Sequence, residues 1–196
     1  MKKLYLLALL FTLLFVGCDD SSSTEPVDDT PDVKVVEVKD VPALGPGLTY
    51  FRFSDSTIVT GADTLSDKWD IAFRRTAIYT NGGVSGPGKG GAIVLKNTDF
   101  YDLKEAPSEG YQVDAENAPA IPTGSGNGWY NYNSETHIIS PIPGVVLVIK
   151  TGDGKYAKVQ IISYYKGAPD NPTLSDESKY YSFRYVYQPN GSTKFE

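Results

Sequence analysis

The sequence contains one cysteine, one methionine and one histidine among its 196 residues. The single cysteine, Cys18, excludes an intrachain disulfide, which needs two. The single histidine, His137, is the only possible base of a Ser-His-Asp triad, and no serine lies in a G-x-S-x-G turn. No group of His, Cys, Asp and Glu has the spacing of a metal site. A pair of catalytic carboxylates for glycoside hydrolysis stays possible, because such a pair can come together on folding without any sequence motif. We nevertheless do not expect an enzyme.

Positive charge is scarce as well. The chain has 18 Lys and Arg against 24 Asp and Glu, and its net charge is −6. An acidic chain without a basic patch has no electrostatic basis for binding nucleic acid. The sequence also lacks a long amphipathic helix that could lie on a membrane surface.

The N-terminal residues 1–17 have the pattern of a secretory signal peptide, with a positively charged start before an apolar run. The run is shorter than the ~20 apolar residues of a dependable membrane span. The stretch "FVGC" that ends at Cys18 resembles the lipobox of bacterial lipoproteins, which implies that Cys18 is lipidated and begins the mature chain. An ordinary signal peptide with an incidental cysteine is the alternative.

The next segment, residues 18–32, is acidic and rich in Ser, Thr and Pro. Such a segment cannot bury enough apolar surface to fold by itself. We therefore expect a flexible tether between the lipid and one domain at residues 33–196. Acidic residues directly after a lipidated cysteine resemble the surface-export signal of Bacteroidetes-type lipoproteins. This resemblance implies a location in the outer membrane, on the cell surface.

The domain has the period-two alternation and the aromatic and β-branched residues that are typical of strands. Strands are predicted at 33–39, 48–53, 56–60, 68–73, 92–96, 128–132, 144–151, 154–165 and 179–187. The alternation predicts that Trp69, Ile71 and Phe73 share one side of their strand. The predicted fold class is all-β: a single antiparallel β domain, barrel or sandwich, with at most one or two short helices.

Turns and ends are less regular. Asp153-Gly154 between two strand patterns predicts a hairpin, and "QPNG" at 188–191 predicts a second turn. The terminal residues 192–196 are predicted to form a short edge strand. The best candidate for a short helix is "DFYDLKEA" at 99–106.

The stretch "NGGVSGPGKGGA" at 81–92 contains G-x-x-x-x-G-K, one residue short of a phosphate-binding loop. Such a loop needs a Ser or Thr after the lysine and a helix after that. Here Gly90 follows Lys89, and a predicted strand comes next. We interpret the stretch as a wide loop between core strands, with glycines at positive φ or in close contact with neighbours.

Four blocks together resemble the HmuY family of outer-membrane lipoproteins: "KWDIAFRR", "NGGVSGPGKGGA", "DGKYAKVQIISYY" and "YYSFRYVYQPNG". They lie in this order behind the lipobox and cover most of the mature domain. The resemblance implies an all-β fold and a surface lipoprotein. It also implies that haem is captured for a TonB-dependent outer-membrane receptor.

Haem binding needs axial ligands to the iron, which are usually His, Met, Cys or Tyr. Most of these residue types are scarce in this sequence. After removal of the signal peptide the chain holds one histidine and no methionine, so two histidines or two methionines cannot come from one subunit. Three arrangements stay open: His137 alone, His137 with a tyrosine, or two copies of His137 in a haem-bridged homodimer. A structural alternative places His137 half-buried on a strand and hydrogen-bonded to a neighbour.

Other readings also stay open. The aromatic residues could line a haem or glycan cleft, with Tyr130, Tyr132, Tyr164 and Tyr165 as candidates. They could also simply pack the core, which we favour. Asp70 is expected to make a salt bridge or a turn bond inside the sheet. Instead of haem, the protein could bind another ligand or a partner protein on the same fold, or serve as a glycan-binding accessory protein.

Overall fold

The computed structural model describes residues 33–196. The predictions for the signal peptide, Cys18 and the tether lie outside these residues. Eleven strands and one 3-10 helix form in the described part: β1 (Val35–Pro42), β2 (Thr49–Arg52), β3 (Thr57–Val59), η1 (Gly61–Leu65), β4 (Ile71–Arg74), β5 (Ala77–Thr80), β6 (Gly91–Leu95), β7 (Tyr130–Tyr132), β8 (Ile139–Pro141), β9 (Val146–Lys150), β10 (Tyr156–Tyr165) and β11 (Ser178–Gln188). No helix in this part is long and apolar enough to cross a membrane.

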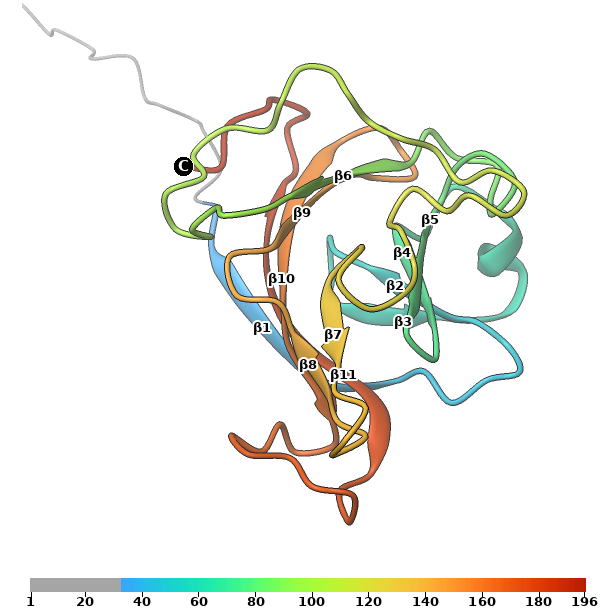
Figure 1. The fold of residues 1–196 in the computed structure, drawn as a ribbon. Coiled ribbons are helices and arrows are strands. Elements are labelled where there is room, and N and C mark those ends of the chain that lie inside the picture. Colours follow the sequence, from blue (N-terminus) through green and yellow to red (C-terminus); the bar gives the residue numbers. More distant parts are fainter. Residues whose placement is uncertain (1–32) are drawn as a thin grey trace, which may run out of the picture.

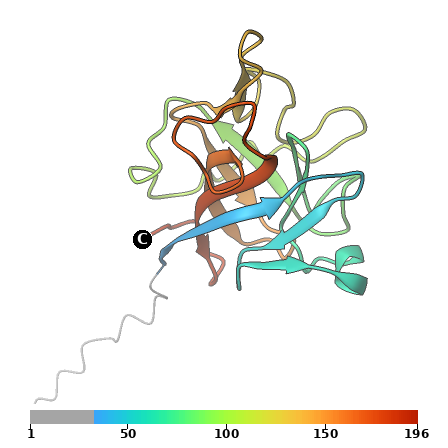
Figure 2. The same ribbon diagram turned by 90° about the horizontal axis from the view of Figure 1, so that it is seen from below.

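The strands form three antiparallel sheets (Figures 1 and 2). A five-stranded sheet has the order β1-β11-β10-β9-β6, a four-stranded sheet the order β3-β2-β4-β5, and β7 and β8 form a separate hairpin. The two larger sheets share one core, because side chains from both belong to the same buried cluster. Phe51 and Phe73 of the smaller sheet lie 5.3 and 5.7 Å, between ring centroids, from Phe183 of the larger. The prediction of an all-β fold is confirmed.

The five-stranded sheet is covered on both faces. Leu147 and Ile149 of β9 face the main core, while Val146 and Val148 pack in a second cluster with Phe100 and Phe195. This explains the continuous apolar run, since alternate residues enter different cores. The hairpin predicted at Asp153-Gly154 joins β9 to β10, and Gly154 has the positive φ, +92°, that such a turn requires.

Four local predictions are wrong. Residues 99–106 do not form a helix but a single turn, in which the Asp99 carboxylate accepts bonds from the backbone N–H groups of Tyr101 and Asp102. This side-chain competition for N–H groups favours a capped turn over a longer helix. Strands β5 and β8, four and three residues long, are missed by the sequence analysis, since a short run gives little alternation to detect.

The other two wrong predictions concern the terminal edge strand and the position of Trp69. Residues 192–196 make one isolated bridge, between Glu105 and Lys194, and Phe195 enters the second cluster instead of extending an edge strand. Trp69 does not share a side with Ile71 and Phe73. It precedes β4 and packs with Val59 and Ala72 on the other face of the four-stranded sheet.

Candidate functional site

The β7–β8 hairpin carries the only histidine and is anchored in the core at its base. Trp129, 2% exposed, donates its indole N–H to the carbonyl of Thr76 at 2.9 Å. The backbone N–H of Ile142 donates to the carbonyl of Trp129 at 2.8 Å. The backbone N–H of Ile139 donates to the hydroxyl of Tyr165 at 3.0 Å. A rigid base therefore holds a short hairpin whose far end projects outward (Figure 1).

The turn at the far end, residues 133–138, fixes the position of His137. The side-chain oxygen of Asn133 accepts bonds from the backbone N–H groups of Glu135 and Thr136 at 2.8 and 3.1 Å. The backbone N–H of Asn133 donates to the carbonyl of Ile138 at 2.9 Å. His137 adopts a φ of +59°, in the left-handed region that non-glycine residues seldom enter. Such a conformation marks a residue held in place by its surroundings.

The side chain of His137 is exposed and contacts Tyr132. Its Nδ1 lies 2.6 Å from the Tyr132 hydroxyl oxygen. The expectation of a half-buried histidine on a strand is therefore wrong, although the hydrogen bond to a neighbour is present. With Nδ1 donating to the hydroxyl, the remaining nitrogen, Nε2, carries the lone pair that a metal ion takes.

The structure separates the tyrosines that were candidates for a ligand cleft. Tyr132 is 44% exposed and belongs to the pair with His137, whereas Tyr130 is 8% exposed and packs in the core. The ring centroid of Tyr130 lies 5.0 Å from that of Trp129. Tyr164 and Tyr165 are buried as well, as the core interpretation predicted. Only His137 and Tyr132 are therefore presented together to an incoming ligand.

A hollow of about 590 Å³ lies between the hairpin turn and the loop that joins β10 to β11, and neither His137 nor Tyr132 is among its lining residues. Both segments lie at the same end of the molecule (lower part of Figure 1). Ile138, Pro172 and Leu174 supply apolar walls, and Thr136 and Asp170 add polar groups. Leu174 is 73% exposed at the edge of the hollow. The hollow has the mixed lining of a small-molecule site.

Sequence reasoning did not identify the loop side of this hollow. The signal was a single apolar residue, Leu174, within the polar stretch "KGAPDNPTLSDESK". The loop is held by an ion pair between Lys166 and Glu177, with 2.6 Å between Nζ and Oε2. The backbone N–H of Gly167 donates to the Asp40 carboxylate at 2.7 Å. Only folding brings β1 and this loop together.

The glycine-rich stretch forms no comparable site. Its backbone wraps the buried side chain of Asn81, which donates to the carbonyls of Ser66 and Trp69 at 2.9 and 2.8 Å and accepts from the N–H of Gly88 at 3.0 Å. A Cβ at Gly90 would lie 2.6 Å from the carbonyl oxygen of Asn81. Strand β6, not a helix, follows. The interpretation as a close-contact loop is confirmed, and the phosphate-loop reading has no structural support.

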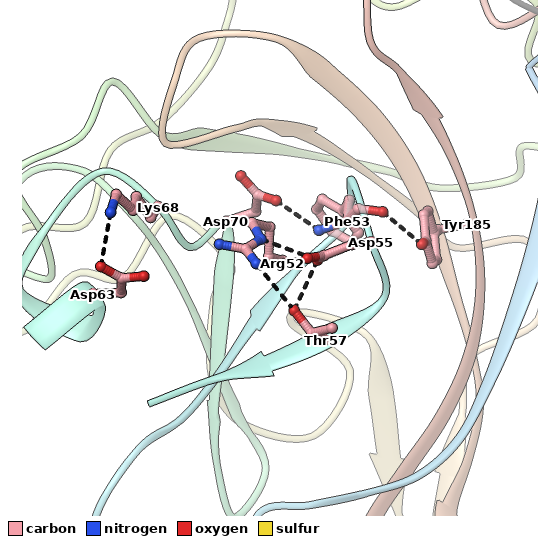
Figure 3. A network of polar contacts seen from close by, with 8 residues as sticks. All are labelled: Arg52, Phe53, Asp55, Thr57, Asp63, Lys68, Asp70 and Tyr185. Carbon is pink, nitrogen blue, oxygen red and sulfur yellow. Dashed lines mark hydrogen bonds and ion pairs between the residues drawn. The ribbon is translucent and has the colours of Figure 1, made fainter. Parts of the chain in front are cut away.

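Asp70 occupies a second polar region, shown in Figure 3. Its carboxylate accepts bonds from the backbone N–H groups of Phe53 at 2.7 Å and Gly152 at 3.2 Å. This confirms the expected turn bond inside the sheet. Burial raises the pKa of Asp70 to about 6, and the two N–H donors oppose that rise.

A hollow of about 180 Å³ borders Asp70, and both of its cationic lining residues are already in ion pairs. Arg52 forms an ion pair with Asp55, and Lys68 forms one with Asp63 at 2.9 Å (Figure 3). Since these groups satisfy one another, the region ties strands together and offers little to a ligand. Across residues 33–196, no three His, Cys, Asp or Glu side chains gather in a way that could hold a metal ion.

Comparisons with known proteins agree with this architecture. A sequence model described as HmuY protein matches residues 46–185 of the chain. No curated protein sequence matches significantly.

Among solved structures, the chain is similar to an apo HmuY analog from Tannerella forsythia, with 18% identity and a TM-score of 0.56, covering 83% of this chain and 100% of that one. It is also similar to a protein described as a candidate lipoprotein from Bacteroides fragilis (17%, TM-score 0.51, 83% and 94% covered). A third similar structure is apo PinO from Porphyromonas gingivitis (20%, TM-score 0.50, 81% and 98% covered). At these identities the structures show a shared fold.

Proposed function

Because the chain belongs to the HmuY family, we propose that it is a surface lipoprotein that captures haem, or a related flat ligand, beside the β7–β8 hairpin. A binding role, rather than catalysis, agrees with the family. The hollow between the hairpin turn and the β10–β11 loop has apolar walls for a macrocycle and a polar rim for its carboxylates.

The pair of His137 and Tyr132 is the observation that carries this proposal. His137 is exposed at the tip of the hairpin. Its chain neighbours Thr136 and Ile138 line the hollow but His137 and Tyr132 do not, so a ligand held by His137 would reach the hollow across the edge of the turn. The contact of 2.6 Å between Nδ1 and the Tyr132 hydroxyl sets the orientation of the imidazole ring. In the tautomer in which Nδ1 donates to the Tyr132 hydroxyl, the lone pair of Nε2 is available to a metal ion. His137 thus supplies the axial ligand to iron, and Tyr132 orients its imidazole ring.

One chain can fill only one of the two axial positions with histidine. A haem with two histidine ligands would need His137 from a second copy, which would make a haem-bridged homodimer. The exposed position of His137 permits such an approach, because no other element of residues 33–196 covers it. With a single chain, the second position would hold water or stay empty.

The proposal extends to the location and partner of the protein. Lipidation of Cys18 would anchor the domain in the outer membrane, with residues 18–32 as a tether. The fold shared with a candidate lipoprotein supports this arrangement. The bound ligand would then be passed to a TonB-dependent outer-membrane receptor.

The test is a haem titration of the soluble protein, residues 19–196, followed by absorbance in the oxidised and reduced states. We expect a saturable, shifted Soret band that His137→Asn abolishes, because Asn tolerates positive φ but is a poor iron ligand. Tyr132→Phe should weaken binding about tenfold, as expected for loss of an orienting partner. Glu135→Ala, in the same turn, is the control and should bind like the native protein.

Stoichiometry and the controls separate the alternatives. One haem per two chains would establish the bridged dimer, and one haem per chain would exclude it. A shifted band that survives His137→Asn would rule out His137 as the ligand. Absence of any shift beyond free haem would contradict the haem proposal. The same fold would then serve a non-haem ligand, a partner protein or a glycan.

A further inference from the structure

A second hollow, of about 450 Å³, lies against the outer face of the four-stranded sheet. It shares no lining residue with the hollow beside the β7–β8 hairpin. One wall is formed by Arg74 of β4 and Tyr79 of β5, and the other by the loop 114–123, which lies close to β5 in Figure 1.

The first wall presents a guanidinium group in a fixed orientation. Arg74 Nη2 donates to the Tyr79 hydroxyl at 2.6 Å, and the guanidinium carbon lies 5.3 Å from the centre of the Tyr79 ring. Stacking and the hydrogen bond together restrict a side chain that otherwise has many rotamers. Arg74 is exposed and forms none of the ion pairs found among residues 33–196. Its remaining N–H donors therefore face solvent or a ligand.

The opposite wall is rigid although it is a loop. Asp114 is 2% exposed, and its two carboxylate oxygens accept the backbone N–H groups of Thr80 at 2.9 Å and Ala120 at 2.7 Å. Its backbone carbonyl accepts the N–H of Val84 at 2.9 Å. These bonds attach the loop to the end of β5, so the shape of the hollow exists before any ligand arrives. A preformed site loses less entropy on binding.

The side chains that line the hollow combine donors with acceptors. Arg74 donates, Glu116 accepts, and Asn117 and Thr123 can do both. Val84, 69% exposed, and Pro119 add an apolar patch. A sugar ring needs this combination, since each hydroxyl both donates and accepts while the C–H groups pack on apolar surface.

The charges narrow the class of ligand further. Asp114 and Glu116 contribute two negative charges and Arg74 one positive charge, so a phosphate or carboxylate would meet a net negative lining. We propose that this hollow binds a neutral saccharide, held by Arg74, Glu116 and Asn117. The inference is independent of haem capture and would give the protein a second ligand at the cell surface.

The test is an NMR titration of the ¹⁵N-labelled protein with galactose, mannose and N-acetylglucosamine, and with glucuronic acid as an anionic probe. We expect saturable shifts at the amides of Tyr79, Val84 and Asn117 with at least one neutral sugar. Arg74→Gln should weaken that binding at least about tenfold, because a charge-assisted hydrogen bond is lost. Arg75→Gln is the matched control: it removes the same charge from the adjacent position, which does not line the hollow.

Each outcome decides the proposal. Loss of binding in Arg74→Gln but not in Arg75→Gln supports it. Equal loss in both variants overturns it, because the effect is then not specific to the hollow. Shifts with glucuronic acid alone overturn it in favour of general attraction of an anion to positive charge. Absence of shifts with every neutral sugar also overturns it. Unchanged amide spectra of the free variants would exclude misfolding as the cause.

Discussion

The glycine-rich segment 81–91 and the hairpin turn 133–138 are built in opposite ways. In the first, backbone and side-chain groups bond to one another around the buried Asn81. In the second, the bonds of Asn133 hold the backbone while His137 stays exposed. A turn whose polar groups are all engaged internally stabilises the fold. A turn that fixes its backbone but exposes one functional side chain is suited to binding.

The largest expected effect concerns the glycine-rich segment. Gly90→Ala would place a methyl group 2.6 Å from the Asn81 carbonyl oxygen, against backbone that cannot move without breaking other bonds. We expect a loss of at least about 3 kcal/mol in the free energy of unfolding, measured by urea denaturation.

Gly47→Ala is the control for this change, because no atom lies within 4 Å of a Cβ at that position. Its stability should stay within about 0.5 kcal/mol of the native protein. Equal stability of Gly90→Ala and Gly47→Ala would show that the glycine-rich segment is not tightly packed.

A second prediction compares two tyrosines of one strand, β7. Tyr130→Ala removes a buried ring that packs on Trp129 and should lower the free energy of unfolding by about 3 to 5 kcal/mol. Tyr132→Ala removes an exposed ring and should cost less than about 1 kcal/mol. Denaturation measures both. A large loss in Tyr132→Ala would mean that the hairpin tip supports the fold and does not merely present His137.

The third prediction is a pH dependence of stability at Asp70, which is at most as large as the two losses expected for the buried positions. Its pKa is raised by burial to about 6 in the folded protein, from 3.8. The folded state therefore binds the proton more tightly than the unfolded state. The contribution of Asp70 to the free energy of unfolding is therefore greatest below about pH 4. It is lost as the pH rises through about 6, and the loss is about 3 kcal/mol at most.

Asp70→Asn isolates this dependence, because it keeps one acceptor oxygen and removes the titrating group. From about pH 4 to about pH 7, the native protein should lose stability relative to the variant. Asp55, whose pKa is lowered to about 2 by Arg52, acts in the opposite direction but below this range. If the free energy of unfolding varies with pH in the same way for the native protein and Asp70→Asn, the pKa of Asp70 is not raised.

Much of the fold could be predicted because its signals are local. Alternation over β10 and β11 is long enough to identify both strands and their core faces. Asp153-Gly154 specifies its hairpin through the backbone conformation of two residues. The short strands β5 and β8 and the place of Trp69 could not be predicted, since pairing and packing with distant segments decide them.

The same limit applies to the candidate site. Composition alone established that only one histidine is available, and so excluded a pair of histidines from one chain. His137 forms a hydrogen bond with Tyr132 and not with Tyr130, because β7 extends beyond the core only at its Tyr132 end.

The sequence by itself determined the all-β class, the family resemblance and the scarcity of iron ligands, because these depend on residue types and their local order. Only the tertiary structure decided which glycines pack against Asn81. It also decided which tyrosine is exposed and which loop faces the hairpin turn. These are contacts between residues far apart in the chain, and their geometry exists only after the sheets have packed.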